Sequence, residues 1–225
     1  MKIYKVGGCN RDEILGIPSN DIDYSVEADS YETMKEYISQ SYKIVYEQPQ
    51  YYTIKAKDKE NNLYDFVLCR KDGSYRDDRH PECVKPGNIL DDLSRRDFTM
   101  NSIAIDMEDG TMIDPYNGIE DIRNRIIKCT GDTHIRLNED VLRLVRAFRF
   151  HIVLDFEIDK DIIQYFWDKN YIQKLESVSK ERIVSEISKC FSFNTSKTMK
   201  TLSTFPVFSD YLFEKIMIIK IQKKA

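Results

Sequence analysis

The sequence has few of the residues that build metal clusters or disulfide frameworks. It contains three histidines and five cysteines, and no two of the cysteines form a Cys-x-x-Cys pair. Five scattered thiols are typical of reduced cysteines in a cytoplasmic protein, so we expect neither a disulfide scaffold nor a structural zinc site. The histidines are His80, His134 and His151, and this wide separation does not predict a histidine-based metal site.

Long apolar runs and an excess of positive charge are also missing. No run of residues is apolar enough to predict a membrane span, and residues 1–6 lead into a strand pattern without the features of a secretory signal. The formal net charge is −4 and the isoelectric point is about 5.5. This balance excludes a protein that coats nucleic acid through its total charge, but it permits a local basic groove.

The order of the patterns predicts an α+β protein of two domains. Short strand patterns and helices alternate up to residue 125, residues 70–88 form an expected long loop, and helical periodicity dominates residues 126–225. Asn138 is the expected N-cap of the first long helix of the second part. The expected strands are 2–6, 22–26, 43–46, 51–56 and 63–68, and the expected helices are 10–15, 31–39, 160–167, 179–190 and a last one from residue 210.

Two carboxylates at a two-residue spacing are the main chemical feature of the sequence. Asp21 and Asp23 flank Ile22 in an expected strand, so their side chains point to the same face. Carboxylates bind hard divalent cations, and two such cations about 3.5–4 Å apart support in-line phosphoryl transfer. Asp65, between apolar neighbours in a later strand, is either a third metal ligand or an aspartate on an edge strand.

A glycine pair ahead of the first expected helix predicts a phosphate site. Gly7 and Gly8 offer unhindered backbone N–H groups, and Arg11 can form a bidentate pair with phosphate oxygens. Glycine pairs and Asp-x-Asp motifs are each common in ordinary turns and strands. The prediction therefore depends on their order and spacing in the same chain.

Three arginines at helical spacing follow further along the chain. Arg143, Arg146 and Arg149 share one side of the expected helix, with Asp140 one turn earlier. They could form a solvated basic stripe on the outer face of an amphipathic helix. Alternatively, the aspartate accepts and the arginine donates hydrogen bonds at the edge of a nucleotide base, which would select the base without a template.

The ordered set of motifs resembles the class II tRNA nucleotidyltransferases and bacterial poly(A) polymerases, within the polymerase-β-like superfamily. Beyond residue 150 the similarity thins to a helical pattern with Glu181, Arg182 and Glu186. The resemblance implies a nucleotidyltransferase head with a small mixed or antiparallel sheet over residues 1–125, and an all-α neck with a shortened body over residues 126–225. The segments that match, in family order, are 6–16, 21–23, 75–84, 95–97, 114–118 and 139–150.

The resemblance also implies a role for each matching residue. Asp21 and Asp23 would hold Mg²⁺, and Asp65 matches the third catalytic carboxylate. The loop at residues 70–86 resembles a flexible loop that is associated with the switch from CTP to ATP. The implied nucleotide-binding residues are Gly8 and Arg11 at the triphosphate, Arg96 and Asp97 at the ribose and phosphates, Asp140 and Arg143 at the base, and Arg146 and Arg149 in support.

Two features depart from the family pattern. Asn10 stands where an apolar residue, usually valine, is typical. The chain is also much shorter than family members, whose later helical domains grip the tRNA.

We therefore expect an enzyme that adds CCA, or its terminal A, to the 3′ end of tRNA from CTP and ATP, with Mg²⁺ and release of pyrophosphate. An oligo(A) or poly(A) polymerase that acts on other RNAs shares these motifs and is an alternative. The short C-terminal part also suggests a tRNA-binding subunit that needs a partner, or a dimer. A nucleotidyltransferase that modifies proteins is a third alternative, although it would not need the long loop. We expect the protein to act in the cytoplasm and not at a membrane.

Overall fold

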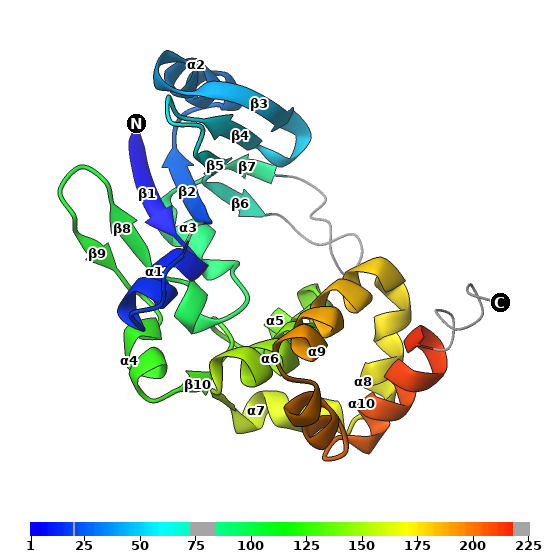
Figure 1. The fold of residues 1–225 in the computed structure, drawn as a ribbon. Coiled ribbons are helices and arrows are strands. Elements are labelled where there is room, and N and C mark those ends of the chain that lie inside the picture. Colours follow the sequence, from blue (N-terminus) through cyan, green and yellow to red (C-terminus); the bar gives the residue numbers. More distant parts are fainter. Residues whose placement is uncertain (20, 73–83, 218–225) are drawn as a thin grey trace. The chain divides into compact units, whose positions relative to one another are not determined.

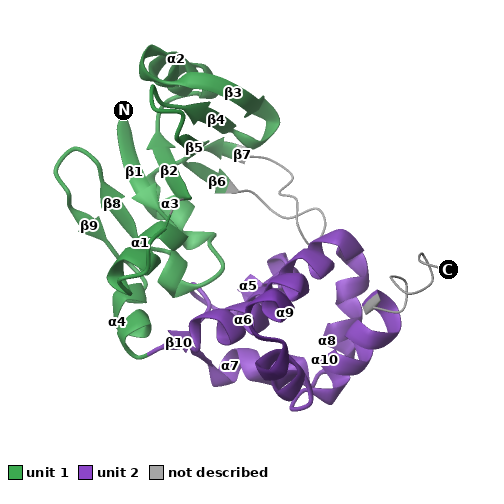
Figure 2. Cartoon of the chain, in the orientation of Figure 1, with its two compact units in different colours: residues 1–124 green, residues 125–225 purple. Residues whose placement is uncertain are grey.

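The protein folds as two compact units, Met1–Asn124 and Arg125–Ala225 (Figures 1 and 2). The computed structural model describes residues 1–19, 21–72 and 84–217. A mixed sheet with helices makes up the first unit, and the second is mainly helical, so the predicted α+β class is confirmed. Within the described residues, no helix combines the length and the apolar character that a membrane crossing requires.

A seven-stranded sheet forms the centre of the first unit. Neighbouring strands are antiparallel except β2 and β5, which run parallel. The mixed sheet that the family resemblance implies is therefore present. In order across the sheet, the strands are β3 (Lys43–Gln48), β4 (Thr53–Lys57), β5 (Leu63–Leu68), β2 (Ile22–Glu27), β1 (Lys2–Val6), β8 (Ala104–Asp106) and β9 (Met112–Ile113).

Alternation of side chains gives strands β2, β5, β4 and β3 one face that packs on a helix and an opposite face that carries Asp23 and Asp65. Ile54 and Phe66 are fully buried on one face and pack with Met34 and Ile38 of helix α2 (Tyr31–Ser41). This helix begins at its N-cap Ser30, whose Oγ accepts a hydrogen bond from Thr33 N at 3.1 Å. The core of this half of the sheet thus lies between α2 and strands β2, β5, β4 and β3.

The remaining elements of the first unit surround strands β1 and β8. Helix α3 contributes Ile89 and Leu93 to a second buried cluster with Tyr4 and Val6 of β1. Its N-cap Asn88 forms a reciprocal capping box with Asp91, which fixes where the helix starts. The helices of this region are α1 (Gly8–Ile14), α3 (Ile89–Ser94) and α4 (Gly118–Arg123), with the short 3₁₀ turn η2 (Thr99–Asn101), while another 3₁₀ turn, η1 (Pro49–Tyr51), connects β3 to β4.

The structure corrects the loop that the sequence predicts at residues 70–88. Strands β6 (Arg70–Asp72) and β7 (Val84–Pro86) pair antiparallel, so both ends of that segment are ordered by backbone hydrogen bonds. The expectation of a continuous loop is therefore wrong at its two ends. Its central part, residues 73–83, lies outside the described residues.

Helices make up most of the second unit. Ring contacts join its elements, because Phe148 of α6 and Phe166 of η3 both pack against Phe208 of α10, with ring centroids 5.4 and 5.2 Å apart. The helices are α5 (Thr133–Glu139), α6 (Leu142–Leu154), α7 (Lys160–Ile163), α8 (Lys169–Gln173), α9 (Lys180–Leu202) and α10 (Pro206–Tyr211), with 3₁₀ turns η3 (Gln164–Phe166) and η4 (Lys174–Ser177), a π-helical turn η5 (Leu212–Met217) and a parallel pair β10 (Ile126–Ile127) and β11 (Glu157–Ile158).

The predicted N-cap at Asn138 is wrong. Asn138 lies in the last turn of α5, where its Nδ2 donates to the carbonyl of His134 at 2.8 Å. The chain breaks at Asp140, which is extended at φ −150° and ψ 101°, and α6 starts two residues later. The Asp140 side chain provides the local cap instead, since its Oδ1 accepts from Leu142 N at 3.0 Å.

Asn10, the departure from the family pattern, ties α1 to the sheet. Its side chain is 1% exposed, and its Nδ2 donates to the carbonyls of Lys5 at 2.8 Å and Ile103 at 2.9 Å. Lys5 belongs to β1, and Ile103 immediately precedes β8. A buried amide in this place is therefore satisfied, and it joins the first helix to two neighbouring strands.

Replacing Asn10 by alanine should destabilise the first unit. The change leaves two buried carbonyls without their donor, so we expect Asn10→Ala to lower the free energy of unfolding by about 2 kcal/mol. The matched control is Gln40→Ala, which removes an exposed amide in α2 and should shift stability by less than about 0.5 kcal/mol. Urea unfolding followed by circular dichroism measures both, and equal stability of the two variants would show that these hydrogen bonds add nothing.

Candidate active site

The sheet brings the carboxylates of two separate strands side by side. Asp23 of β2 and Asp65 of β5 are direct partners in the parallel ladder, so their side chains lie on the same face. Asp21 immediately precedes β2, two residues before Asp23. β5 lies between β4 and β2, so the alternative in which Asp65 sits on an edge strand is wrong.

The negative charges of Asp23 and Asp65 lie close together, and the charge of Asp23 is partly removed from water. The Asp23 residue is exposed, yet the protein around its carboxylate displaces water, and this desolvation raises its pKa. The negative charges of Asp65 and Asp21 raise the pKa further, while Arg96 opposes them. Lys55 of β4 also opposes them, and its Nζ pairs with Asp65 Oδ2 at 2.7 Å. A cation at this point would relieve the repulsion between the carboxylates.

The donor set fits a divalent cation that is shared with a substrate. Asp65 Oδ1 is buried and accepts no hydrogen bond from any residue that the structure describes, so one carboxylate oxygen of the pair has no partner there. No group of three His, Cys, Asp or Glu side chains that could hold a metal ion occurs among residues 1–19, 21–72 and 84–217. Mg²⁺ usually takes one or two carboxylates and completes its shell with water and substrate phosphates, and the carboxylates here suit that mode.

Gly7 makes room for the groups that meet at this face. Its φ of +85° favours glycine, and a Cβ there would lie 3.1 Å from Arg96 Nη1 and 3.6 Å from Asp23 Oδ2. The next residue, Gly8, begins α1, and a Cβ on it would lie 3.3 Å from Arg11 Nη2. The two glycines therefore allow the guanidinium groups of Arg96 and Arg11 and the carboxylate of Asp23 to approach the same stretch of backbone.

One amide links two of the nucleotide-binding residues predicted from the sequence. Arg11 is buried, pairs with Asp12 at 2.7 Å and donates through Nη1 to Asn101 Oδ1 at 2.8 Å. Asn101 in turn donates through Nδ2 to Asp97 Oδ1 at 3.0 Å. Arg11 and Asp97 are thus held by a common partner, and the sequence reasoning did not identify Asn101.

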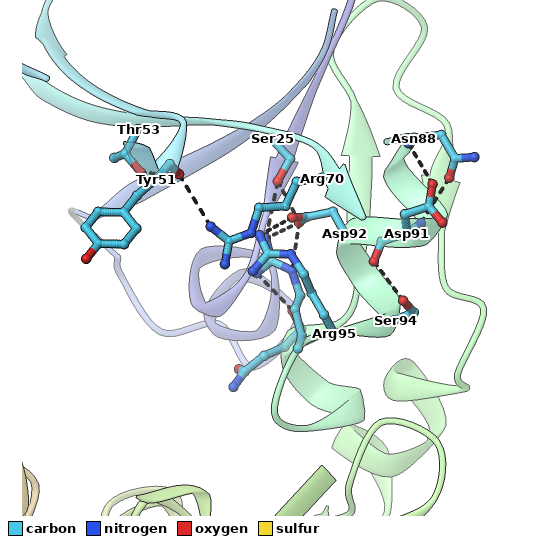
Figure 3. Close-up of polar contacts among 11 residues, drawn as sticks. Ser25, Tyr51, Thr53, Arg70, Asn88, Asp91, Asp92, Ser94 and Arg95 are labelled. Carbon is cyan, nitrogen blue, oxygen red and sulfur yellow. Dashed lines mark hydrogen bonds and ion pairs between the residues drawn. The ribbon is translucent and has the colours of Figure 1, made fainter. Parts of the chain in front are cut away.

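A buried carboxylate, Asp92 of α3, positions Arg96. Asp92 is 0% exposed, and its Oδ2 accepts from Ser25 Oγ at 2.8 Å (Figure 3). The same oxygen of Asp92 accepts from Arg96 Nη2 at 2.9 Å. Arg95 donates to its other oxygen. Burial alone would raise the pKa of Asp92, but the two guanidinium groups and the hydrogen bonds hold it well below its usual range. Ser25 lies on the same face of β2 as Asp23, so Asp92 fixes Arg96 beside the carboxylates.

The second unit contains the four other residues predicted to contact the nucleotide. Asp140 lies in the turn between α5 and α6, and its Oδ2 accepts from Arg182 of α9 at 3.1 Å. Arg143 is 8% exposed, and its Nη1 donates to Glu139 Oε2 at 2.8 Å and to the Arg136 carbonyl at 2.6 Å. Both side chains are therefore held in fixed orientations at the start of α6.

The alternative of a solvated basic stripe on α6 is wrong. Arg143 is buried and Arg146 and Arg149 are half-buried, because most of the circumference of α6 packs against other elements. Arg149 pairs with the buried Glu186 of α9 and lies over the Phe150 ring, 3.9 Å from its centroid. Burial opposes ionisation of Glu186, but Arg149 and Arg146 lower its pKa.

The predicted site residues thus fall into two groups, one in each unit. Gly8, Arg11, Arg96 and Asp97 lie in the first unit, where Arg96 acts on the charge of Asp23, and the other four lie in the second. The sequence reasoning did not single out Asp92, Asn101 or Lys55 as site residues. The spacing of Asp92 to Arg95 and Arg96, at i+3 and i+4 on a helix, was a signal that could have identified the first of them.

Comparison with known protein families matches the first unit and part of the second. The family described as the poly A polymerase head domain matches residues 3–128. The CCA-adding enzyme of Staphylococcus epidermidis is 33% identical over 219 residues, which cover 94% of this chain and 53% of that protein. The CCA-adding enzyme of Geobacillus stearothermophilus is 37% identical over 187 residues, covering 83% and 44%. The chain spans about half the length of these curated relatives.

Solved structures of CCA-adding enzymes are similar to the chain across both units. The Bacillus stearothermophilus enzyme in complex with CTP is 32% identical with a TM-score of 0.75, and covers 92% of this chain and 47% of that one. The Thermotoga maritima enzyme complexed with tRNA is 25% identical with a TM-score of 0.76, covering 95% and 48%. An apo form of a CCA-adding enzyme reaches a TM-score of 0.81 at 28% identity, covering 95% and 50%.

Removing the charge of Asp92 should destabilise the protein in a pH-dependent way. Asp92→Asn leaves two arginines beside a neutral amide, and we expect a loss of about 3–5 kcal/mol of unfolding free energy at pH 7. Since its folded-state pKa is lowered, the wild-type carboxylate contributes fully at neutral pH. That contribution starts to fall as the pH drops below about 4, the usual value of an unfolded aspartate.

Urea unfolding at pH 7, 5 and 3 tests this expectation. The difference between wild type and Asp92→Asn should be equal at pH 7 and 5 and smaller at pH 3. The exposed Asp29→Asn serves as the control and should change stability by less than about 0.5 kcal/mol. A difference that is absent at pH 7, or that grows in acid, would contradict the role assigned to Asp92.

Proposed function

The chain belongs to the family of class II CCA-adding enzymes and poly(A) polymerases, and on this basis we propose that it adds CCA, or its terminal A, to the 3′ end of tRNA. The observation that carries the proposal is the Asp23–Asp65 pair on adjacent strands, with Arg96 and Gly7 beside it. The relatives named CCA-adding enzymes, and the related structures that hold CTP or tRNA, support the choice of substrates. We place this activity in the cytoplasm.

The reaction proposed is a phosphoryl transfer between an RNA end and a nucleoside triphosphate. The 3′-hydroxyl oxygen of the RNA forms a bond to the α-phosphorus of CTP or ATP. The bond between the α- and β-phosphates breaks, and pyrophosphate leaves with that electron pair. Asp65, directly beside Asp23 on the adjacent strand, would accept the hydroxyl proton.

Mg²⁺ is the cofactor that we propose for this site. Asp21 and Asp23 would hold it, together with phosphate oxygens of the nucleotide. When bound, the ion would neutralise phosphate charge and hold the reacting oxygens in line. The raised pKa of Asp23 supports a bound cation at this place, as does the Asp65 oxygen that has no hydrogen-bond partner among the described residues.

The groups around the glycine pair would bind the triphosphate and ribose. The backbone at Gly8 is open on the side where Arg11 lies, so phosphate oxygens can approach both. Arg96 is held by Asp92 and Ser25 and needs no reorganisation to meet negative charge. Asp97, bonded to Asn101, would accept a hydrogen bond from the ribose 2′-hydroxyl.

The start of α6 would select the base. Asp140 accepts and Arg143 donates hydrogen bonds in a plane, as the edge of cytosine or adenine requires. Arg182 and Glu139 hold these two side chains in place, and Arg146 and Arg149 support the helix from within. Selection by fixed protein groups explains how a base can be chosen without a template strand.

Removing the Asp23 charge should abolish nucleotide addition without loss of stability. Because the folded protein raises the pKa of Asp23, its charge is unfavourable there, and Asp23→Asn should unfold at the same or a slightly higher temperature than wild type. We expect its rate of incorporation to fall about 10³-fold or more, the scale on which transition-state charge stabilisation is lost. Asp29→Asn, beyond the opposite end of β2, should remain active.

The assay uses tRNA transcripts that end before CCA, after C or after CC, each with Mg²⁺ and CTP, ATP or both. Three additions that stop at CCA support the full activity, and one A added only to the CC-ended transcript supports A addition. Long A tracts would instead assign the protein to the poly(A) polymerases. Absence of addition by the wild type, or full activity of Asp23→Asn, would overturn the proposal.

Changing the base-reading pair should blur nucleotide choice. Asp140→Ala removes an acceptor, and Arg143→Lys keeps the charge but loses the planar fork, so either should lower the preference for CTP and ATP over UTP and GTP about tenfold or more. The ratio of kcat/KM values for the four nucleotides measures this preference. Arg136→Lys, which also alters an arginine paired with Glu139, is the control and should leave the ratios unchanged. If the ratios are also unchanged in Asp140→Ala and Arg143→Lys, these two residues do not select the base.

A further inference from the structure

A row of side chains crosses four strands from the catalytic carboxylates to the edge of the sheet. Asp23 pairs with Asp65, Asp65 with Lys55 of β4, and Lys55 with Tyr46 of β3. Residues directly opposite in neighbouring strands point to the same face, so these four share one face. With strands about 4.8 Å apart, the row extends about 14 Å from Asp23.

Over β5, β4 and β3 this face is turned away from the hydrophobic cluster that packs on α2. Ile54, Ala56 and Phe66, which alternate with the row, are buried in the cluster that includes Met34 and Ile38 of α2. On the row itself, Tyr46 is 50% exposed and the Lys55 side chain 41%. An aromatic ring and a cation therefore lie in solvent on the same surface as the carboxylates.

A second pair of cations lies beside the row. Lys43 of β3 and Lys57 of β4 are directly opposite each other, and among the described residues neither forms an ion pair. Like charges in this relation destabilise a sheet, so an anion that binds between them would be favoured. Leu63, opposite Lys57 on β5, adds an exposed apolar side chain to the same face.

We propose that this face, defined by Lys43, Tyr46, Lys55, Lys57 and Leu63, binds the single-stranded end of the RNA substrate. The proposal rests on the proposed function, in which the RNA 3′-hydroxyl must reach Asp23 and Asp65. The nucleotides before that hydroxyl then lie on adjoining surface. Lysines meet backbone phosphates, and the exposed ring stacks on a base, the combination that single-stranded nucleic acid binding uses.

Charge complementarity selects RNA over other occupants of this face. Three lysines and an aromatic ring suit a polyanion with planar bases, and the face is continuous with the carboxylates where that polyanion reacts. A protein segment could instead add to the edge strand β3 through backbone hydrogen bonds. That mode would depend on the backbone of β3 and not on the ring or the lysines.

Binding of a short single-stranded RNA that ends in CC tests the stacking contact directly. Tyr46→Ala should weaken binding about tenfold, within the range measured for stacked bases, while Tyr46→Phe should bind as wild type because the ring is kept. Tyr37→Ala is the matched control, since Tyr37 is similarly exposed at 47% but belongs to α2 on the other side of the sheet. Fluorescence anisotropy gives the affinities without any need for catalysis.

The salt dependence of binding tests the lysines. Replacing both Lys43 and Lys57 by alanine should make the slope of log K against log salt less steep by about 1.4, because each lost phosphate contact on a single strand contributes about 0.7. Lys2→Ala, at the far end of β1 from Asp23, should leave the slope unchanged. An unchanged slope in the double variant would overturn the proposal.

Kinetics separates failure of this inference from failure of the proposed function. In the nucleotide-addition assay, Tyr46→Ala should raise KM for the RNA about tenfold and leave KM for the nucleotide unchanged. If the variants add nucleotides normally and neither KM nor RNA affinity changes, the RNA binds elsewhere on the protein. The inference is then wrong while the proposed function stands. If the wild type binds RNA through this face but adds no nucleotide, the inference stands and the function is wrong.

Discussion

The charge of Asp92 is the constraint on which the site in the first unit depends. A carboxylate at 0% exposure needs compensation, and Arg95, Arg96 and Ser25 provide it. Because these partners come from β2 and from the end of α3, the same interaction fixes the helix against the sheet. It also places the Arg96 guanidinium against Gly7, next to Asp23. The stability of the unit and the orientation of the Arg96 guanidinium therefore have one physical cause.

Positive charge in this protein is local, although the total is negative. Arg11 and Arg96 are fixed by neighbouring carboxylates and amides, and the lysines of β3 and β4 stand on the face that continues from Asp65. Such groups can attract phosphates at short range without a strongly basic protein. The negative carboxylates in the same place would repel phosphates unless a cation were bound, so the proposed binding of the triphosphate depends on the proposed metal ion.

Buried ion pairs play a similar part in the second unit. α6 carries its arginines inside the unit, where Glu139, Glu186 and the Phe150 ring surround them. Removing one partner of such a pair leaves an uncompensated charge, which is strongly unfavourable. The geometry at the start of α6 therefore depends on α9, whose Arg182 and Glu186 reach Asp140 and Arg149.

The sequence by itself determined the class of fold and the order of most elements in the first unit, and it supplied the candidate site residues of both units. Strand alternation and the Asp21–Asp23 spacing are local properties, so they can be read along the chain. Only the tertiary structure decided that Asp65 lies directly beside Asp23, that Asp92 holds Arg96, and that Asn101 joins Arg11 to Asp97. It also decided that the helix predicted from Asn138 begins after Asp140, because side-chain contacts at that turn override local periodicity. Those facts depend on which strands are neighbours and which charges are buried, and partners distant in sequence set both.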